Sequence, residues 1–292
     1  MNLGQIGIWC GGVWRVDEHA AEAGDVAAEL ERLGYGTLWL SGGFTPGFTG
    51  RFRMLLDATS RISVASGILS IWLASPAEAA KGFAELEAAH PDRFLLGLGV
   101  SHAPAVESRG ESYTRPYSRM VRYLDDLDRQ EPLVPADRRV LAALGPRMLT
   151  LAARRAAGAH PYFVPPEHTA RAREILGDGP LLAPEQAVVL ETDPALARQI
   201  ARSHTEYYLS APNYTSNLRR LGFGDADLEG GGSDRLIDAV VAWGDVATVA
   251  ERVREHHQAG ADHVCVQVLT ATSGEAFPRA EYRALAEALL AK

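Results

Sequence analysis

The residues best suited to chemistry follow a glycine-rich turn in the first half of the chain. The motif Gly97-Leu98-Gly99-Val100-Ser101-His102 comes directly after an apolar run at 94–96. Glycines let a ligand approach the backbone closely, and an imidazole exchanges a proton near neutral pH. An ordinary turn after a strand would have the same glycines, but Ser101 and His102 favour a functional interpretation. We expect His102 to act as a general acid or base.

A second motif has the features of an anion site. Gly145-Pro146-Arg147 follows an apolar run at 140–144 and opens a helix predicted to extend through Ala156. The start of a helix presents free amide groups and the positive end of the helix dipole, which together suit a phosphate. The alternative is that Gly145-Pro146 only turns the chain and that Arg147 is a solvated charge.

Other chemistries lack the motifs that they require. The chain has no G-x-S-x-G elbow and no HExxH pair, which argues against a serine hydrolase and a zinc enzyme. Its two cysteines, Cys10 and Cys265, are too few for a disulfide scaffold or a cysteine-based metal site, so we expect reduced, packed thiols and no bound metal. His160, at a predicted strand boundary, is a further candidate for the site.

The elements that would position these residues alternate along the chain. Short apolar runs separated by longer amphipathic ones predict parallel strand–helix–strand units, and 292 residues is the size of one closed (β/α)8 barrel. The predicted strands are 3–9, 37–41, 62–71, 94–99, 140–144, 159–164, 181–190 and 263–269. We therefore expect an α/β fold, a single TIM-barrel domain over 1–292, with an insertion around 204–232 before the last strand that could form a lid.

The alternation of side chains along the strands indicates which residues point into the barrel. Outward positions should be apolar, as are Val264, Val266 and Val268 in the last strand, so Cys265 and Gln267 point inward. The same argument directs Trp9 and Ser41 inward. Among the tryptophans, only Trp9 and Trp72 lie at predicted strand ends, where they would line a pocket.

Composition restricts the partners. A hydrophobic fraction of 47% supplies a large core, and a formal net charge of −8 without a basic stripe argues against nucleic acid. No apolar run is long enough for a membrane span, and no targeting segment is evident. We expect a cytoplasmic protein whose partner is a small molecule.

Several of these segments together resemble the luciferase-like monooxygenases, and most closely their branch that depends on the deazaflavin coenzyme F420. The resemblance rests on Gly34-Tyr35-Gly36-Thr37-Leu38-Trp39, on Gly67 to Trp72 followed by Ser75-Pro76-Ala77-Glu78, and on Asp92 to His102. The stretch from Leu144 to Phe163 is similar to the same branch.

The resemblance implies an enzyme that transfers a hydride between coenzyme F420 and a small organic substrate, in a homodimer. It places the ring of the cofactor over an irregular peptide at Gly67-Ile68 and its phosphate near Ser101 and Gly145-Pro146. Trp9, Ser41, Arg147 and His160 are then further candidates for cofactor binding. His102 would supply the proton that accompanies the hydride.

The chain departs from the family pattern after the second strand. Many members have an acidic residue and a histidine there, whereas this chain has Ser41-Gly42-Gly43, and His102-Ala103-Pro104 lacks a carboxylate that relatives carry. A sugar or alcohol dehydrogenase is therefore disfavoured. Two alternatives remain open: an FMN-dependent monooxygenase that uses molecular oxygen, and a flavin-binding protein without catalytic activity.

Overall fold

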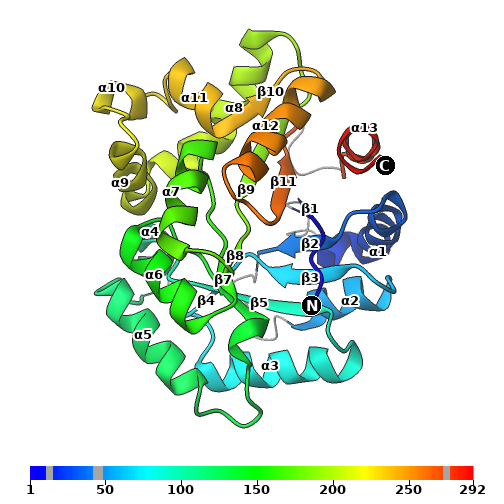
Figure 1. Ribbon diagram of the computed structural model, residues 1–292, viewed down its shortest axis with the longest axis vertical. Coiled ribbons are helices and arrows are strands. Elements are labelled where there is room, and N and C mark those ends of the chain that lie inside the picture. Colours follow the sequence, from blue (N-terminus) through cyan, green and yellow to red (C-terminus); the bar gives the residue numbers. More distant parts are fainter. Residues whose placement is uncertain (11–15, 42–48, 109, 272–276, 292) are drawn as a thin grey trace.

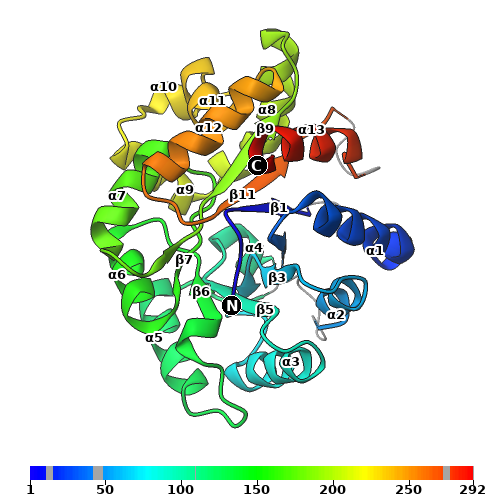
Figure 2. The ribbon, with the colours of Figure 1, turned by 45° about the vertical axis from the view of Figure 1, so that its right-hand side comes forward.

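A computed structural model describes residues 1–10, 16–41, 49–108, 110–271 and 277–291, and in it the helices surround a curled parallel sheet (Figures 1 and 2). The strands are β1 (Ile6–Trp9), β2 (Thr37–Leu40), β3 (Ser63–Ser66), β4 (Leu69–Ser70), β5 (Phe94–Gly99), β6 (Arg139–Leu141), β7 (Gly158–Ala159), β8 (Leu181–Leu182), β9 (Glu185–Val189), β10 (Val241–Trp243) and β11 (Val264–Val268). The α-helices are α1 (Val16–Leu33), α2 (Thr49–Asp57), α3 (Pro76–Ala89), α4 (Ala103–Glu107), α5 (Pro116–Leu127), α6 (Pro146–Arg155), α7 (Pro166–Leu176), α8 (Pro194–Leu209), α9 (Pro212–Arg220), α10 (Asp225–Leu228), α11 (Asp234–Val240), α12 (Val246–Gln258) and α13 (Arg279–Leu290).

The sheet closes on itself through one continuous stretch of chain. Its strand order is β10-β9-β11-β1-β2-β3-β5-β6-β7-β8, with β4 paired to β5. β8 and β9 are separated only by residues 183 and 184. Ala183 N donates to Ala159 O (2.9 Å) beside β7, and Cys265 N donates to Pro184 O (2.9 Å) on the opposite side. The barrel-like architecture expected from the sequence is confirmed.

The strands differ from the sequence-based expectations in several places. β10 was not predicted, because its three residues directly continue the apolar pattern of α11, yet it pairs with β9 through Val241 and Ala187. Two predicted strands, 62–71 and 181–190, are each divided in two. The predicted strand 159–164 ends at residue 159 in the structure, where Pro161 and Pro165 follow and cannot donate to a ladder.

The alternation expected along the strands is confirmed by two separate cores. Inside the ring, Trp39, Cys265 and their neighbours from other strands pack together. Outside it, Ile8, Val264 and Val266 belong to the larger core beneath the helices. Cys10 and Cys265 are buried free thiols.

The helix starts follow the signals in the sequence. Ser75 and Glu78 form a reciprocal capping box at the start of α3, and Asp245 caps α12. α6 begins at Pro146 as expected. Within the described residues, no helix is both long and apolar enough to cross a membrane.

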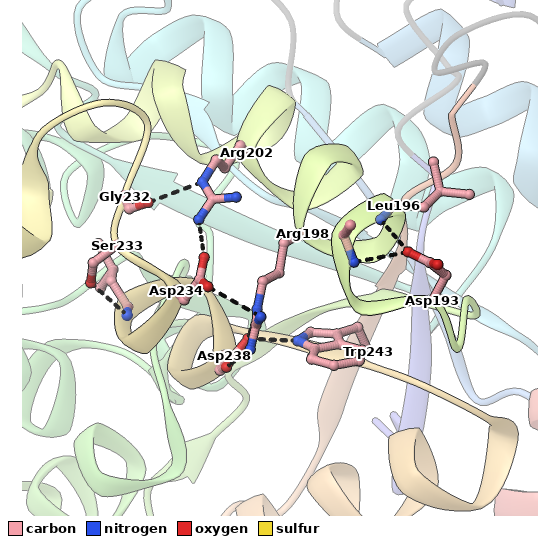
Figure 3. A network of polar contacts seen from close by, with 11 residues as sticks. Asp193, Leu196, Arg198, Arg202, Gly232, Ser233, Asp234, Asp238 and Trp243 are labelled. Atoms are coloured by element: carbon pink, nitrogen blue, oxygen red, sulfur yellow. Dashed lines mark hydrogen bonds and ion pairs between the residues drawn. The ribbon is translucent and has the colours of Figure 1, made fainter.

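Ion pairs on the outside of the barrel fix α8 against α11 (Figure 3). Arg198 donates to both carboxylate oxygens of Asp238 (2.9 and 2.6 Å) and pairs with Asp234 at 3.1 Å. Arg202 pairs with Asp234 as well and donates to Gly232 O at 3.1 Å. Trp243 Nε1 donates to Asp238 (2.7 Å), so β10 is included in the same network.

Candidate active site

A cavity of about 660 Å³ opens where the carboxyl ends of the barrel strands meet. This is the end of the fold at which barrel enzymes place their chemistry. All ten residues predicted for the site line it: Trp9, Ser41, Gly67, Ile68, Ser101, His102, Gly145, Pro146, Arg147 and His160. The structure therefore brings the predicted residues together, while their individual roles remain predictions. Gly42 and Gly43 of the loop after Ser41 lie outside the described residues.

One wall of the cavity contains the irregular peptide expected from the sequence. The Gly67–Ile68 bond is cis, which confirms that prediction. A side chain at Gly67 would collide with the Trp9 ring and would lie 3.3 Å from His160 Nε2. Glycine is therefore required by the close approach of these rings.

His160 is held in one protonation state by its neighbours. Its ring stacks on Trp39, with centroids 4.1 Å apart, and its Nδ1 lies 2.7 Å from the carbonyl oxygen of Ala183. Burial lowers the pKa of His160 to about 4, so the ring is neutral at pH 7. Because a carbonyl can only accept, the proton is on Nδ1. His160 Nε2 is then a buried acceptor, and it has no protein partner.

The charged side chains of the cavity lie together beside the start of α6. Among the described residues that line the cavity, Arg147 and Arg220 are the charged ones and none is acidic. Arg220 comes from α9, and its Nη2 is 3.5 Å from where a side chain on Gly145 would begin. The Arg147 guanidinium lies 4.1 Å from the centre of the Tyr117 ring. Partial burial of its guanidinium lowers the pKa of Arg220, although the residue as a whole is exposed and remains charged.

Tyrosines form another wall of the cavity. Tyr162 and Tyr208 have ring centroids 5.1 Å apart, as do Tyr208 and Tyr214, and Tyr207 packs edge-on against Tyr208 at 5.2 Å. The hydroxyls of Tyr162 and Tyr208 are 2.8 Å apart, and Tyr162 donates to Gln267 Oε1 at 2.7 Å. Burial raises the pKa of both hydroxyls, so they stay protonated. We call Tyr162, Tyr207, Tyr208 and Tyr214 the tyrosine wall.

His102 stands at the edge of the tyrosine wall. It precedes α4, and its Nε2 is 2.7 Å from the Tyr207 hydroxyl. Burial lowers its pKa. A histidine lining the cavity in this way can exchange a proton with a bound molecule.

A buried carboxyl lies below the tyrosine wall. Glu185 Oε2 accepts a hydrogen bond from Phe163 N (3.1 Å), and Oε1 has no partner. Burial raises the pKa of Glu185 to about 8. This group is mostly protonated at neutral pH and adds no full charge to the inner site.

Most of the tyrosine wall and Arg220 were not predicted from the sequence. The sequence offered one signal for the wall, a local concentration of tyrosines, since three of the nine tyrosines fall between positions 207 and 214. In contrast, the predicted pocket residue Trp72 is not among the lining residues. Its Nε1 donates to Val100 O (2.8 Å) and its ring contacts Arg119 at 3.8 Å.

No group of histidine, cysteine, aspartate and glutamate side chains suited to a metal ion occurs in the described part of the chain. The donor set of the cavity instead combines aromatic rings, neutral hydrogen-bonding groups and two guanidinium groups. Such a set fits an organic ligand with one aromatic end and one anionic end.

Comparison with known proteins supports the observed fold. The family model of the luciferase-like monooxygenases matches residues 1–131. No curated protein matches significantly in sequence.

Solved structures share the fold over nearly the whole chain. An F420-dependent secondary alcohol dehydrogenase, in complex with an F420–acetone adduct, has a TM-score of 0.75 at 16% identity over 98% of both chains. The F420-dependent tetrahydromethanopterin reductase from Methanopyrus kandleri has a TM-score of 0.70 at 16% identity over 97% of both chains. The oxygenating constituent of 3,6-diketocamphane monooxygenase from Pseudomonas putida, in complex with FMN, has a TM-score of 0.68 at 14% identity over 99% of this chain and 97% of that one.

Proposed function

We propose that this chain, which resembles the luciferase-like monooxygenases in sequence over residues 1–131 and in fold over nearly its whole length, is an oxidoreductase. It would transfer a hydride between coenzyme F420 and a small organic substrate. The observation that carries the proposal is the distribution of charge in the cavity. Two arginines lie beside the α6 start, and the cis Gly67–Ile68 peptide and His160 lie among neutral rings. A phosphorylated ring cofactor has matching ends.

The residues present fit such a group at both of its ends. Arg147, Arg220 and the first amides of α6 would hold the phosphate, because guanidinium groups and helix starts both bind phosphate oxygens. His160 Nε2, an acceptor without a protein partner, would accept a hydrogen bond from a ring N–H. Trp9 and Ser41 also line the cavity and would add contacts to the cofactor. The bound deazaflavin supplies the hydride chemistry.

The protein contributes orientation, exclusion of water and proton transfer. The tyrosine wall covers one side of the cavity with packed rings, which keeps water from the reacting atoms. His102 would take up the proton released when substrate is oxidised. Because its pKa is lowered, its imidazole is neutral and ready to accept at pH 7. In the direction of reduction, protonated His102 would donate.

FMN is the second candidate cofactor, since a structural neighbour holds FMN in the same fold. The deciding experiment is a calorimetric titration of the purified chain with F420 and FMN side by side. We expect F420 to bind at least about tenfold more tightly, a difference of about 1.4 kcal/mol. Equal or tighter binding of FMN would overturn the assignment. Turnover of any substrate would exclude a purely flavin-binding role.

We further propose that the chain acts as one domain, with 204–232 as an insertion that supplies part of the tyrosine wall. We also propose a cytoplasmic homodimer. Sedimentation velocity of the purified chain tests the dimer, and a single species of monomer mass at micromolar concentration would contradict it.

A further inference from the structure

The hydrogen bonds of the tyrosine wall have one possible direction. The Gln267 Oε1 atom can only accept, so the single hydroxyl hydrogen of Tyr162 is directed to it. Tyr162 must then accept from Tyr208 across their 2.8 Å contact. Both hydroxyl hydrogens are therefore used within the protein. What Tyr208 can still offer a molecule in the cavity is an oxygen lone pair.

The surroundings of Tyr208 carry no full charge at neutral pH. Its raised pKa keeps it protonated, the lowered pKa of His102 keeps that imidazole neutral, and Glu185 below the wall is mostly protonated. The arginines lie instead beside Gly145, where the phosphate site is proposed. A charged substrate group at the tyrosine wall would lose its hydration without gaining a counter-charge.

The shape of the wall favours a flat, aromatic occupant. Tyr162, Tyr208 and Tyr214 pack against one another with tilted or edge-on rings, which fixes their positions before any ligand binds. Phe163 supports them from behind, stacked on Tyr208 at 5.1 Å and edge-on to Tyr214 at 5.8 Å. Preformed aromatic surfaces gain most from another ring, through stacked or edge-to-face contact.

From these three observations we propose that the substrate is an uncharged, flat aromatic compound with a phenolic hydroxyl, and that this hydroxyl donates to the oxygen of Tyr208. The inference rests on the proposed function, because it assigns the phosphate end of the cavity to the cofactor. It adds the class of substrate and the atom that recognises it.

The test uses four small probes titrated by calorimetry into the full chain, with and without saturating F420. They are 1-naphthol, 1-methoxynaphthalene, which lacks the donor hydrogen, 1-decalol, which lacks the aromatic ring, and 1-naphthoate, which is charged. We expect 1-naphthol to bind about fivefold to tenfold more tightly than each of the others, as for one hydrogen bond or one set of ring contacts. Equal binding of the methoxy compound, or tighter binding of decalol or naphthoate in the F420-loaded chain, would overturn the proposal.

Two variants test the hydroxyl hydrogen bonds while keeping every aromatic ring in place. Tyr208→Phe keeps the ring and should abolish the preference for 1-naphthol over 1-methoxynaphthalene, while binding of the latter changes less than twofold. Tyr162→Phe frees the Tyr208 hydrogen, so binding of the acceptor 1-acetylnaphthalene should improve severalfold relative to 1-naphthol. An unchanged preference in Tyr208→Phe would contradict the assignment, and circular dichroism confirms that each variant is folded.

The same titrations distinguish failure of this inference from failure of the proposed function. If F420 does not bind but 1-naphthol keeps its preference and loses it in Tyr208→Phe, the cofactor assignment is wrong and the recognition by Tyr208 stands. If F420 binds and the four probes bind alike, the substrate class is wrong and the cofactor assignment stands.

Discussion

The two ends of the cavity are built on different physical principles. Beside α6, Arg147 and Arg220 are exposed and charged and come from surface helices. Around Gly67–Ile68 and the tyrosine wall, the groups are neutral and are fixed by ring contacts and by hydrogen bonds to buried backbone. The first end can attract an anion from solvent, whereas the second offers fixed geometry with no competing charge. The contrast suggests that affinity and chemistry are assigned to separate parts of one cavity.

The largest expected effect is on stability in acid, because buried neutral groups respond to pH while arginines do not. Burial lowers the pKa of five histidines to about 4 or below: His160, His168, His204, His256 and His263. Below pH 6.5 the unfolded chain binds protons at these positions and the folded chain does not, so stability falls as pH falls towards 4.

The effect of Glu185 on the pH dependence of stability is opposite to that of the histidines. Its pKa is about 8 in the folded chain, so its contribution to stability is present at low pH and is lost as pH rises from about 4.5 to 8. The five histidines should dominate below pH 6.5. We expect the free energy of unfolding to fall by at least about 3 kcal/mol between pH 6.5 and 5, given about 1.4 kcal/mol per proton and pH unit. Urea unfolding at each pH measures it, and a flat profile would show that these imidazoles are not kept neutral.

The next largest effect concerns the proton at the neutral end. His102→Ala should reduce turnover of an identified substrate about hundredfold or more and leave F420 affinity nearly unchanged, as expected for loss of a general acid or base. Steady-state kinetics and the cofactor titration measure the two quantities. Tyr207→Phe is the matched control for the His102 contact, and its effect should be smaller. Full activity of His102→Ala would assign the proton to another group.

A smaller effect is expected at the charged end. Arg220→Ala should weaken F420 binding about tenfold, because a charged hydrogen bond to phosphate is lost. The same ring system without its phosphate should bind the variant and the parent chain equally. Arg219→Ala is the matched control, since Arg219 is also exposed but pairs with Asp225 at 2.7 Å and does not line the cavity. Equal loss in both variants would remove the distinction between the two ends.

The sequence predicted the parts of the fold that are locally encoded. Period-two alternation predicted the inward direction of Trp9 and Gln267, and the Gly145-Pro146 motif predicted the start of α6. β10 was missed because three residues that continue an apolar helix carry no separate pattern. Its pairing with β9 depends on contacts that only the assembled barrel provides.

The candidate site was predictable where residues follow a strand directly. Ser101, Gly145 and His160 each come just after a run that any barrel would place at its mouth. Arg220 and Tyr208 come from helices far along the chain from the glycine motifs, and their approach to the cavity depends on how α8 and α9 are packed. The direction of the Tyr208–Tyr162–Gln267 hydrogen bonds likewise follows only from the three-dimensional structure.

The anchoring of α8 bears on how readily such a protein can acquire new substrates. Arg198 and Arg202, one helical turn apart, fix the outer side of this helix through Asp234 and Asp238 (Figure 3), while its last turns carry Tyr207 and Tyr208 into the cavity wall. Substitution at the two tyrosines therefore leaves the attachment of the helix intact. Selection could exchange the residues that meet the substrate one at a time, with the cofactor end of the cavity and the barrel beneath it unchanged.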